Sequence, residues 1–144
     1  MADLPEGFLT RPLAHRALHD VSDGRPENSR AAIGAAISAG YGIEIDIQRS
    51  ADDVPVAFHD YHLGRLTGAT GLVAEQPAKD LEQIRLTGGH EGIPTLGEVL
   101  EIVAGTVPLL VEIKDQDGAM GPRVGPLEHA VAAALRDYEG PVAV

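Results

Sequence analysis

The stretch GIEIDIQ, residues 42–48, alternates isoleucines with acidic side chains, and this pattern constrains the fold more than any other part of the chain. Strict alternation with a period of two is typical of a β-strand, because successive side chains point to opposite faces. Glu44 and Asp46 therefore share one face of the predicted strand, and the isoleucines share the other. A solvated polar face would explain one such strand, so function needs further evidence.

Predicted helices and strands alternate along the rest of the chain. Residues 26–29, PENS, supply helix-start chemistry before an Ala-rich helix that Gly40 closes, and Thr95 with Glu98 forms a capping box for a second helix that Gly105 closes. Residues 61–92 are expected to be loop and short helix. The expected strands are PLAHRA, GIEIDIQ, VPVAFH, VPLLVEIKD and PVAV, and the expected helices RAAIGAAISAG, IPTLGEVLEIVAG and GPLEHAVAAALRDYEG. This order predicts an α/β fold with a mostly parallel sheet.

Charge and composition exclude several classes of protein. The formal charge of −11 argues against non-specific binding of nucleic acid and against docking on anionic lipid. The absence of cysteine excludes disulfides, thiolate catalysis and Cys-based zinc sites. The first twenty residues lack the pattern of a signal peptide, and no apolar run approaches the length of a membrane span, so we expect a cytoplasmic protein without a stable membrane anchor.

The strand VPLLVEIKD repeats the arrangement of GIEIDIQ. Glu112 and Lys114 share one face of this strongly apolar segment, and buried charges are costly unless they are paired or coordinate a metal ion. Acids on two strands predict a carboxylate cluster for a hard divalent cation, Mg²⁺ or Ca²⁺, since both prefer oxygen ligands. The repetition favours a functional interpretation of Glu44 and Asp46.

His59 follows these acids closely enough to share their site. If Asp52 and Asp53 form a two-residue hairpin turn, Asp46 lies directly opposite His59. If the two strands are parallel neighbours, residues 49–53 must cross back in an extended form, which about 3.3–3.6 Å per residue barely permits. The sequence leaves both geometries open.

His15 and Arg16 end the first predicted strand, and strand ends are where α/β folds gather their active sites. Two histidines, three acids and two cations at such ends predict cleavage of a phosphate ester. One histidine would accept a proton, the other would give one to the leaving alkoxide, and the metal ion would neutralise phosphate charge. Arg16 and Lys114 suit the phosphate oxygens.

Several short motifs occur in a fixed order: HRA, PENS, GIEIDIQ, VPVAFHD, LGRLTG, IPTLGEVL and LLVEIK, between residue 13 and about residue 115. Together they resemble the glycerophosphodiester phosphodiesterases. The resemblance implies a TIM-type (β/α)₈ barrel and metal-dependent hydrolysis of glycerophosphodiesters to glycerol 3-phosphate and an alcohol. The attacking group would be the neighbouring glycerol hydroxyl or a metal-bound water.

The resemblance also implies roles for individual residues. His15 would accept the proton and His59 would donate it, while the remaining residues bind metal or substrate. The implied metal ligands are Glu44, Asp46 and Glu112, and the implied substrate-binding residues are Arg16, Lys114, Glu27 and Asn28.

The chain departs from the family pattern in two ways. Ala17 stands where a glycine usually follows His-Arg, and residues 1–144 form one domain that holds only about the first five of eight barrel strands. We expect self-association through the open strand edges. A non-catalytic barrel fragment that binds metal or a partner chain is one rival hypothesis. A sphingomyelinase D-like phospholipase is another, although the chain lacks the disulfides of those secreted proteins.

Overall fold

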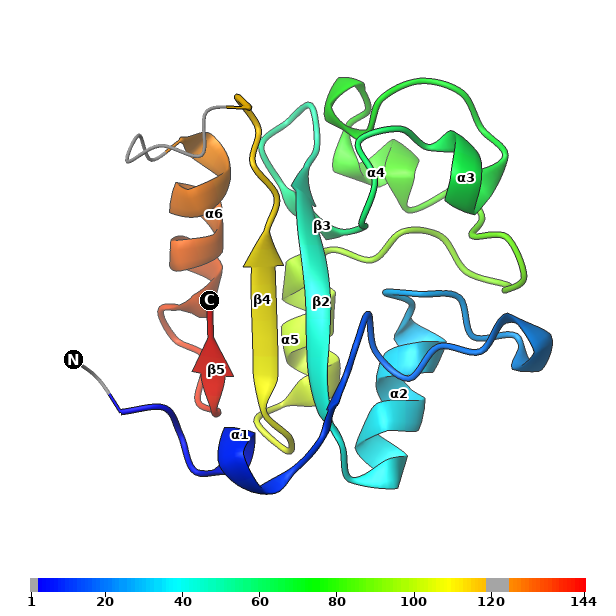
Figure 1. The fold of residues 1–144 in the computed structure, drawn as a ribbon. Helices are drawn as coiled ribbons and strands as arrows, with labels where there is room; N and C mark the ends of the chain where they lie inside the picture. The colour runs from blue at the N-terminus through cyan, green and yellow to red at the C-terminus, as the bar shows by residue number, and fades with distance from the viewer. Residues whose placement is uncertain (1–2, 119–124) are drawn as a thin grey trace.

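A single five-stranded sheet organises the computed structural model, which describes residues 3–118 and 125–144 (Figure 1). Its central path runs in the order β1, β2, β4, β5, and neighbouring strands on this path are parallel. The fifth strand, β3, pairs antiparallel with β2. The strands are β1 (Leu13–Ala14), β2 (Gly42–Arg49), β3 (Pro55–Ala57), β4 (Leu109–Ile113) and β5 (Val142–Ala143). These five correspond to the five strands predicted from the sequence.

Helices connect the parallel strands, and their ends follow the predicted capping chemistry. Ser29 caps α2 (Arg30–Ala39), which ends at Gly40 in the left-handed conformation. Thr95 and Glu98 form the expected capping box at the start of α5 (Leu96–Val103). The prediction that Gly105 closes α5 is off by one residue, because Ala104 is the left-handed C-cap, with φ of 45°. The other helices of the sheet layer are α1 (Gly7–Thr10), the 3₁₀-helix η1 (Val21–Asp23) and α6 (Pro126–Leu135).

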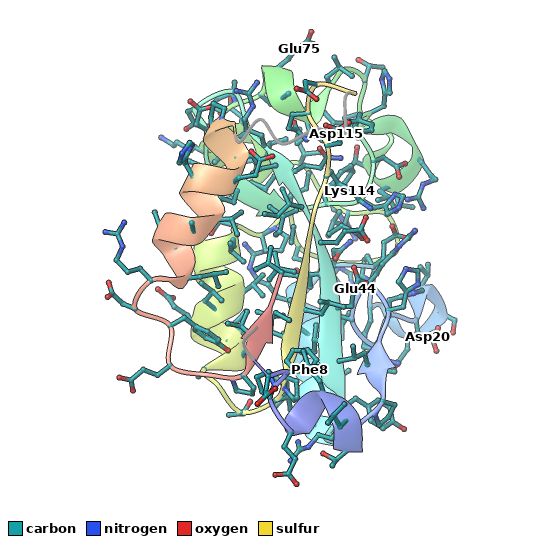
Figure 2. The ribbon with its side chains drawn as sticks, turned by 60° about the vertical axis from the view of Figure 1, so that its left-hand side comes forward. Phe8, Asp20, Glu44, Glu75, Lys114 and Asp115 are labelled. Carbon is teal, nitrogen blue, oxygen red and sulfur yellow. The ribbon has the colours of Figure 1, made fainter. Side chains whose placement is uncertain are left out.

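The main core lies between the sheet and its helices. Ile43, Ile45 and Ile47 are fully buried and belong to one hydrophobic cluster with residues of α2, α5 and α6. The acidic side chains of β2 therefore point to the opposite face. Figure 2 shows this division, with α5 and α6 on one side of the strands and the labelled Glu44 and Lys114 on the other.

The segment from β2 to β3 is an antiparallel hairpin, which decides between the two geometries left open by the sequence. Its turn holds three residues rather than two, because Ser50 and Val54 pair across it and Asp53 is left-handed at φ of 59°. The register shifts by one, so the backbone N–H of Phe58 donates to Asp46 O at 3.0 Å. The expectation that His59 lies directly opposite Asp46 is wrong for this reason.

A second, smaller core lies under the residues that follow β3. Val56, Phe58 and Leu63 begin this cluster, and residues as far as Ile93 complete it. Short elements surround it, as predicted for this region. They are α3 (Gly64–Thr67), η2 (Val73–Glu75) and α4 (Ala78–Leu81). Figure 1 shows α3 and α4 beside the upper end of β2, so this small layer lies next to the carboxyl end of the strand that carries the acids.

The parallel path with helices along one face is the architecture of part of a (β/α)₈ barrel. His15 and Lys114 directly follow the carboxyl ends of β1 and β4, and His59 comes two residues after the end of β3. In the part of the chain that the structure describes, no helix combines the length and hydropathy that crossing a bilayer requires.

Candidate active site

Three carboxylates form the centre of the candidate site. Glu44 and Asp46 come from β2, Glu112 comes from β4, and the parallel register places Asp46 directly beside Glu112. One oxygen of each carboxylate lies within 4.8 Å of an oxygen of each of the others. Side chains alternate between the two faces of each strand, so acids from β2 and β4 come together on one face of the sheet. This is the carboxylate cluster that the sequence predicted.

Glu44 is a buried acid with one unsatisfied oxygen. Its side chain accepts a hydrogen bond at Oε2 from the backbone N–H of Arg16 at 2.7 Å. Its Oε1 is buried and has no hydrogen-bond partner among the described residues. Burial raises the pKa of Glu44, and the nearby charges of Asp46 and Glu112 also act to raise it, against the hydrogen bond from Arg16. A positive charge at Oε1 would pair this oxygen and would offset the burial and the carboxylate repulsion that raise the pKa of Glu44.

Asp46, by contrast, is buried and fully paired. Its Oδ2 accepts from Asn28 Nδ2 at 2.9 Å, while Asn28 Oδ1 accepts from the backbone N–H of Asp46 at 3.1 Å. Its Oδ1 lies 2.8 Å from Lys114 Nζ. Burial acts to raise the pKa of Asp46, but the hydrogen bonds from Lys114 and Asn28 outweigh it and lower this pKa. Asp46 is therefore an anion at neutral pH.

The chemistry of this cluster fits a hard divalent cation. Carboxylate oxygens are the ligands that Mg²⁺ and Ca²⁺ prefer, and an unpaired buried oxygen such as Glu44 Oε1 is costly without a cation or donor. Lys114 already supplies one positive charge, because its ammonium contacts both Asp46 and Glu112. Glu112 is more than half exposed, which leaves the cluster open on the side of β4.

A strained turn after β1 delivers His15 and Arg16 to the cluster. Arg16 and Ala17 are both left-handed, at φ of 56° and 63°, and the N–H of Ala17 donates to Glu44 O at 3.0 Å. His15 Nε2 lies 4.0 Å from Glu44 Oε2, and its side chain is 71% exposed. In the family that the chain resembles, a glycine usually stands at position 17, and glycine adopts this left-handed conformation without strain. The same conformation costs an alanine about 1–2 kcal/mol.

His59 is held from the other side by a chain of charged residues. Its Nδ1 lies 2.6 Å from Asp60 Oδ1, and Asp60 in turn accepts hydrogen bonds from Arg65. The hydrogen bonds from Arg65 are the largest cause of the low pKa of Asp60, which is lowered well below its usual range although burial opposes this. An ionised carboxylate can only accept, so Nδ1 of His59 carries the hydrogen and Nε2 is the atom left for proton exchange.

The residues predicted from the sequence all lie in this one connected cluster. Glu27 and His59 join the cluster indirectly, since Glu27 bonds Arg16 and Arg65, His59 contacts Asp60, and neither bonds the three carboxylates among the described residues. Sequence reasoning did not nominate Asp60 or Arg65 for the site, although Arg65 lies in the motif LGRLTG and Asp60 in VPVAFHD. It also omitted Gln48, which is buried on the acidic face of β2 and donates to His59 O at 2.9 Å.

Fold and site together define a partial (β/α)₈ barrel with a carboxylate cluster flanked by two histidines at the carboxyl ends of its strands. Residues 15–140 match the Glycerophosphoryl diester phosphodiesterase family. The chain belongs to this family.

Curated relatives and solved structures agree with this assignment. The chain is 31% identical over 139 residues to a glycerophosphodiester phosphodiesterase of Caldanaerobacter subterraneus, with 90% of the chain and 54% of the relative covered. It is 32% identical over 113 residues to glycerophosphodiester phosphodiesterase 1 of Homo sapiens, with 71% of the chain and 33% of the relative covered. The chain therefore spans between a third and somewhat more than half of these relatives.

Two solved structures carry the comparison into three dimensions. An Oleispira antarctica phosphodiesterase in complex with the product sn-glycerol-3-phosphate has a TM-score of 0.78 and 29% identity, over 94% of this chain and 57% of that one. A Thermotoga maritima glycerophosphodiester phosphodiesterase has a TM-score of 0.71 and 29% identity, over 90% of this chain and 50% of that one. The structural neighbours are TIM barrels, which confirms the predicted fold class.

Proposed function

We propose that this domain carries the metal-binding and acid–base part of a glycerophosphodiester phosphodiesterase, which releases glycerol 3-phosphate and an alcohol. The observation that carries the proposal is the cluster of Glu44, Asp46 and Glu112 with a histidine on either side. The Oleispira antarctica relative, which holds sn-glycerol-3-phosphate, supports a glycerol phosphate product.

The carboxylates would hold one divalent cation, Mg²⁺ or Ca²⁺, which when bound neutralises charge on the phosphate. Arg16 and Lys114 would bind phosphate oxygens, because both of these positively charged side chains lie beside Asp46. Asn28 would keep Asp46 oriented through its paired hydrogen bonds. Lys114 would then exchange part of its contact with the acids for contact with substrate.

The histidines would move the protons of the reaction. His15, beside Glu44 and largely exposed, would accept the proton of the attacking hydroxyl as its oxygen bonds to phosphorus. Attack by water would give glycerol 3-phosphate directly, whereas attack by the glycerol hydroxyl of the substrate would first give a cyclic phosphate, which water then opens to glycerol 3-phosphate. As the bond between phosphorus and the alcohol oxygen breaks, its electron pair leaves with that oxygen. His59 would then transfer its Nε2 proton to the departing oxygen while Asp60 accepts from Nδ1 and stabilises the imidazolium.

The first experiment measures hydrolysis of glycerophosphocholine by the 144-residue chain with added Mg²⁺ or Ca²⁺ and then with EDTA. We expect turnover that EDTA abolishes and that one of the two ions restores. Turnover that is unaffected by chelation contradicts the metal assignment. No turnover under any condition contradicts the enzymatic proposal and favours the rival hypothesis of a barrel domain that binds metal or a partner without catalysis.

The second experiment replaces the proposed proton donor. For His59→Ala we expect a loss of about 10²–10⁴-fold in turnover of glycerophosphocholine, because choline is a poor leaving group without a proton. His129→Ala is the matched control, since His129 is exposed on α6 and bonds only the helix-start carbonyl of Gly125 among the contacts described. Near-full activity of His59→Ala shows that another group donates the proton.

Two further expectations stay predictions of the sequence. One is a cytoplasmic location, and the other is self-association through the edges of β1 and β5. Light scattering on the purified chain measures the second directly.

A further inference from the structure

Arg65 is the most connected side chain near the candidate site. Its Nε and Nη2 donate to the two oxygens of Asp60, each at 2.7 Å. Its Nη2 and Nη1 also donate to the two oxygens of Glu27, at 2.9 and 3.2 Å. One planar guanidinium therefore binds two carboxylates at once, each through both of its oxygens. Lysine, with a single ammonium group, does not offer this geometry.

The two carboxylates that Arg65 grips come from different parts of the fold. Asp60 follows β3 and lies beside the small second core, whereas Glu27 lies in the loop between β1 and α2. Arg65 itself belongs to the single-turn helix α3, whose neighbours Leu63 and Leu66 pack into the second core. Arg65 thus joins the small second layer to the loop after the first barrel strand.

Each carboxylate holds a residue with a proposed role in the reaction. Asp60 Oδ1 lies 2.6 Å from Nδ1 of His59, the proposed proton donor. Glu27 Oε1 accepts from Nη1 of Arg16 at 3.1 Å, and Arg16 is proposed to bind phosphate. A continuous path of contacts therefore runs from His59 through Asp60, Arg65 and Glu27 to Arg16, with Arg65 at its midpoint.

We propose that Arg65 is a positioning residue that aligns the proton donor with a phosphate-binding side chain, an inference that rests on the proposed function. It acts on His59 through Asp60. It acts on Arg16 through Glu27. Without the guanidinium, Asp60 keeps only its contact with His59 among the described side chains, and both are then free to turn together about their χ angles.

Stability alone does not account for this arrangement. The Arg65 side chain is 49% exposed, and exposed ion pairs contribute only about 0–1 kcal/mol to the free energy of unfolding. A guanidinium that makes four hydrogen bonds in fixed directions instead defines geometry. Two carboxylates that would otherwise repel each other are held by one guanidinium next to the groups that they orient.

The test compares two substrates that differ only in the leaving alcohol. Choline needs a proton from His59 as it departs, whereas p-nitrophenolate leaves without one. For Arg65→Met we expect kcat on glycerophosphocholine to fall by about 10–100-fold, the range found when an outer hydrogen-bond partner of a metal-ligating histidine is removed. We expect kcat on glycerophospho-p-nitrophenol to stay nearly unchanged, and KM to rise for both esters because Arg16 is displaced.

Two variants separate positioning from general damage. Arg65→Lys keeps the positive charge but loses the planar group that can donate to both oxygens of a carboxylate. Its kcat on glycerophosphocholine should therefore lie between those of the parent and Arg65→Met. Arg85→Met removes an arginine of the same small layer that bonds Gly89 and His90, and it should behave like the parent. Equal losses of kcat on both esters in Arg65→Met, or no loss on either, overturn the proposal.

A second readout does not depend on turnover. Nitrogen NMR of the His59 imidazole, assigned by its loss in His59→Gln, should show Nδ1 protonated in the parent and a mixture of tautomers in Arg65→Met. An unchanged tautomer in Arg65→Met overturns the positioning role. If the parent hydrolyses neither ester, the proposed function fails while this measurement still decides whether Arg65 orients His59.

Discussion

The two faces of β2 are both buried, and they are buried by opposite means. On one face the isoleucines have no exposed surface and pack against α2, α5 and α6. On the other, Glu44 and Asp46 are 8% and 1% exposed and lie among ions and hydrogen bonds. Burial is therefore similar on the two faces, while its energetic sign differs, because apolar burial is favourable and the burial of charge is costly.

The difference shows where this domain gains stability and where it gives stability up. The isoleucine face follows the rule that apolar surface leaves water, and it needs no partner of fixed geometry. The acidic face is supported by Arg16, Asn28 and Lys114, but Oε1 of Glu44 has no hydrogen-bond partner in the described part of the chain. An unpaired buried oxygen lowers the free energy of unfolding, and it is a position at which a cation would bind.

The largest expected effect comes from breaking the apolar face. Ile45→Ala should lower the free energy of unfolding by about 2–5 kcal/mol, because it removes fully buried methyl groups and leaves a cavity. Urea denaturation measures the change. Ile102→Ala is the matched control, since the side chain of Ile102 on α5 is 37% exposed, and it should cost much less. Equal costs at the two positions would mean that the packed core does not lie where the structure places it.

A smaller effect of the opposite sign is expected on the acidic face. Because the pKa of Glu44 is raised, the folded chain binds the proton of this carboxyl more tightly than the unfolded chain does. Stability is therefore lost as pH rises from the unfolded pKa through the folded pKa, and above the folded pKa the ionised side chain opposes folding. At neutral pH in EDTA, Glu44→Gln should therefore raise the free energy of unfolding by about 0.5–2 kcal/mol, and added Mg²⁺ or Ca²⁺ should stabilise it less than the parent.

The control for this variant is Glu101→Gln, which neutralises an exposed acid on α5 and should leave both quantities unchanged. Thermal unfolding with and without the cation measures both. A Glu44→Gln variant that is less stable than the parent in EDTA would show that the carboxylate is well paired in the folded chain.

The smallest effect is expected at Ala17, in the turn after β1. This residue belongs to the apolar core but holds a left-handed φ of 63° beside Glu44. In Ala17→Gly, relief of about 1–2 kcal/mol of backbone strain opposes the loss of a buried methyl group, about 0.8 kcal/mol, and the entropy cost of glycine, about 0.4–1 kcal/mol. The net change in the free energy of unfolding should be close to zero.

Ala36→Gly provides the comparison for this substitution. Ala36 is fully buried in the interior of α2 and has no strain to relieve, so the same replacement should cost about 1–2 kcal/mol there. Denaturation curves of the two variants measured side by side give the difference. If Ala17→Gly costs as much as Ala36→Gly, the left-handed turn carries little strain.

Much of the candidate site could be predicted because it depends on local rules. The period of a strand sets the shared face of Glu44 and Asp46, and the cap chemistry of Ser29 and Thr95 sets the starts of α2 and α5. His15 was predicted for the site from its place at a strand end. Each of these inferences uses residues within a few positions of one another.

The features that the sequence did not determine depend on contacts between distant residues. The sequence left a hairpin and a parallel crossing open, and the register predicted for the hairpin is wrong because the left-handed residue Asp53 lengthens the turn and shifts the pairing by one position. Arg65 was not nominated because its partners Asp60 and Glu27 meet only when the small second layer docks beside the loop after β1.

The sequence by itself determined the alternating order of helices and strands, the acidic face of β2 and the family resemblance, since these follow from residue types and their spacing. Only the tertiary structure decided which basic side chain pairs with which acid, and that Oε1 of Glu44 has no hydrogen-bond partner among the described residues. The physical reason is that pairing of charges depends on distances of a few ångströms between segments, and packing of the whole domain sets those distances.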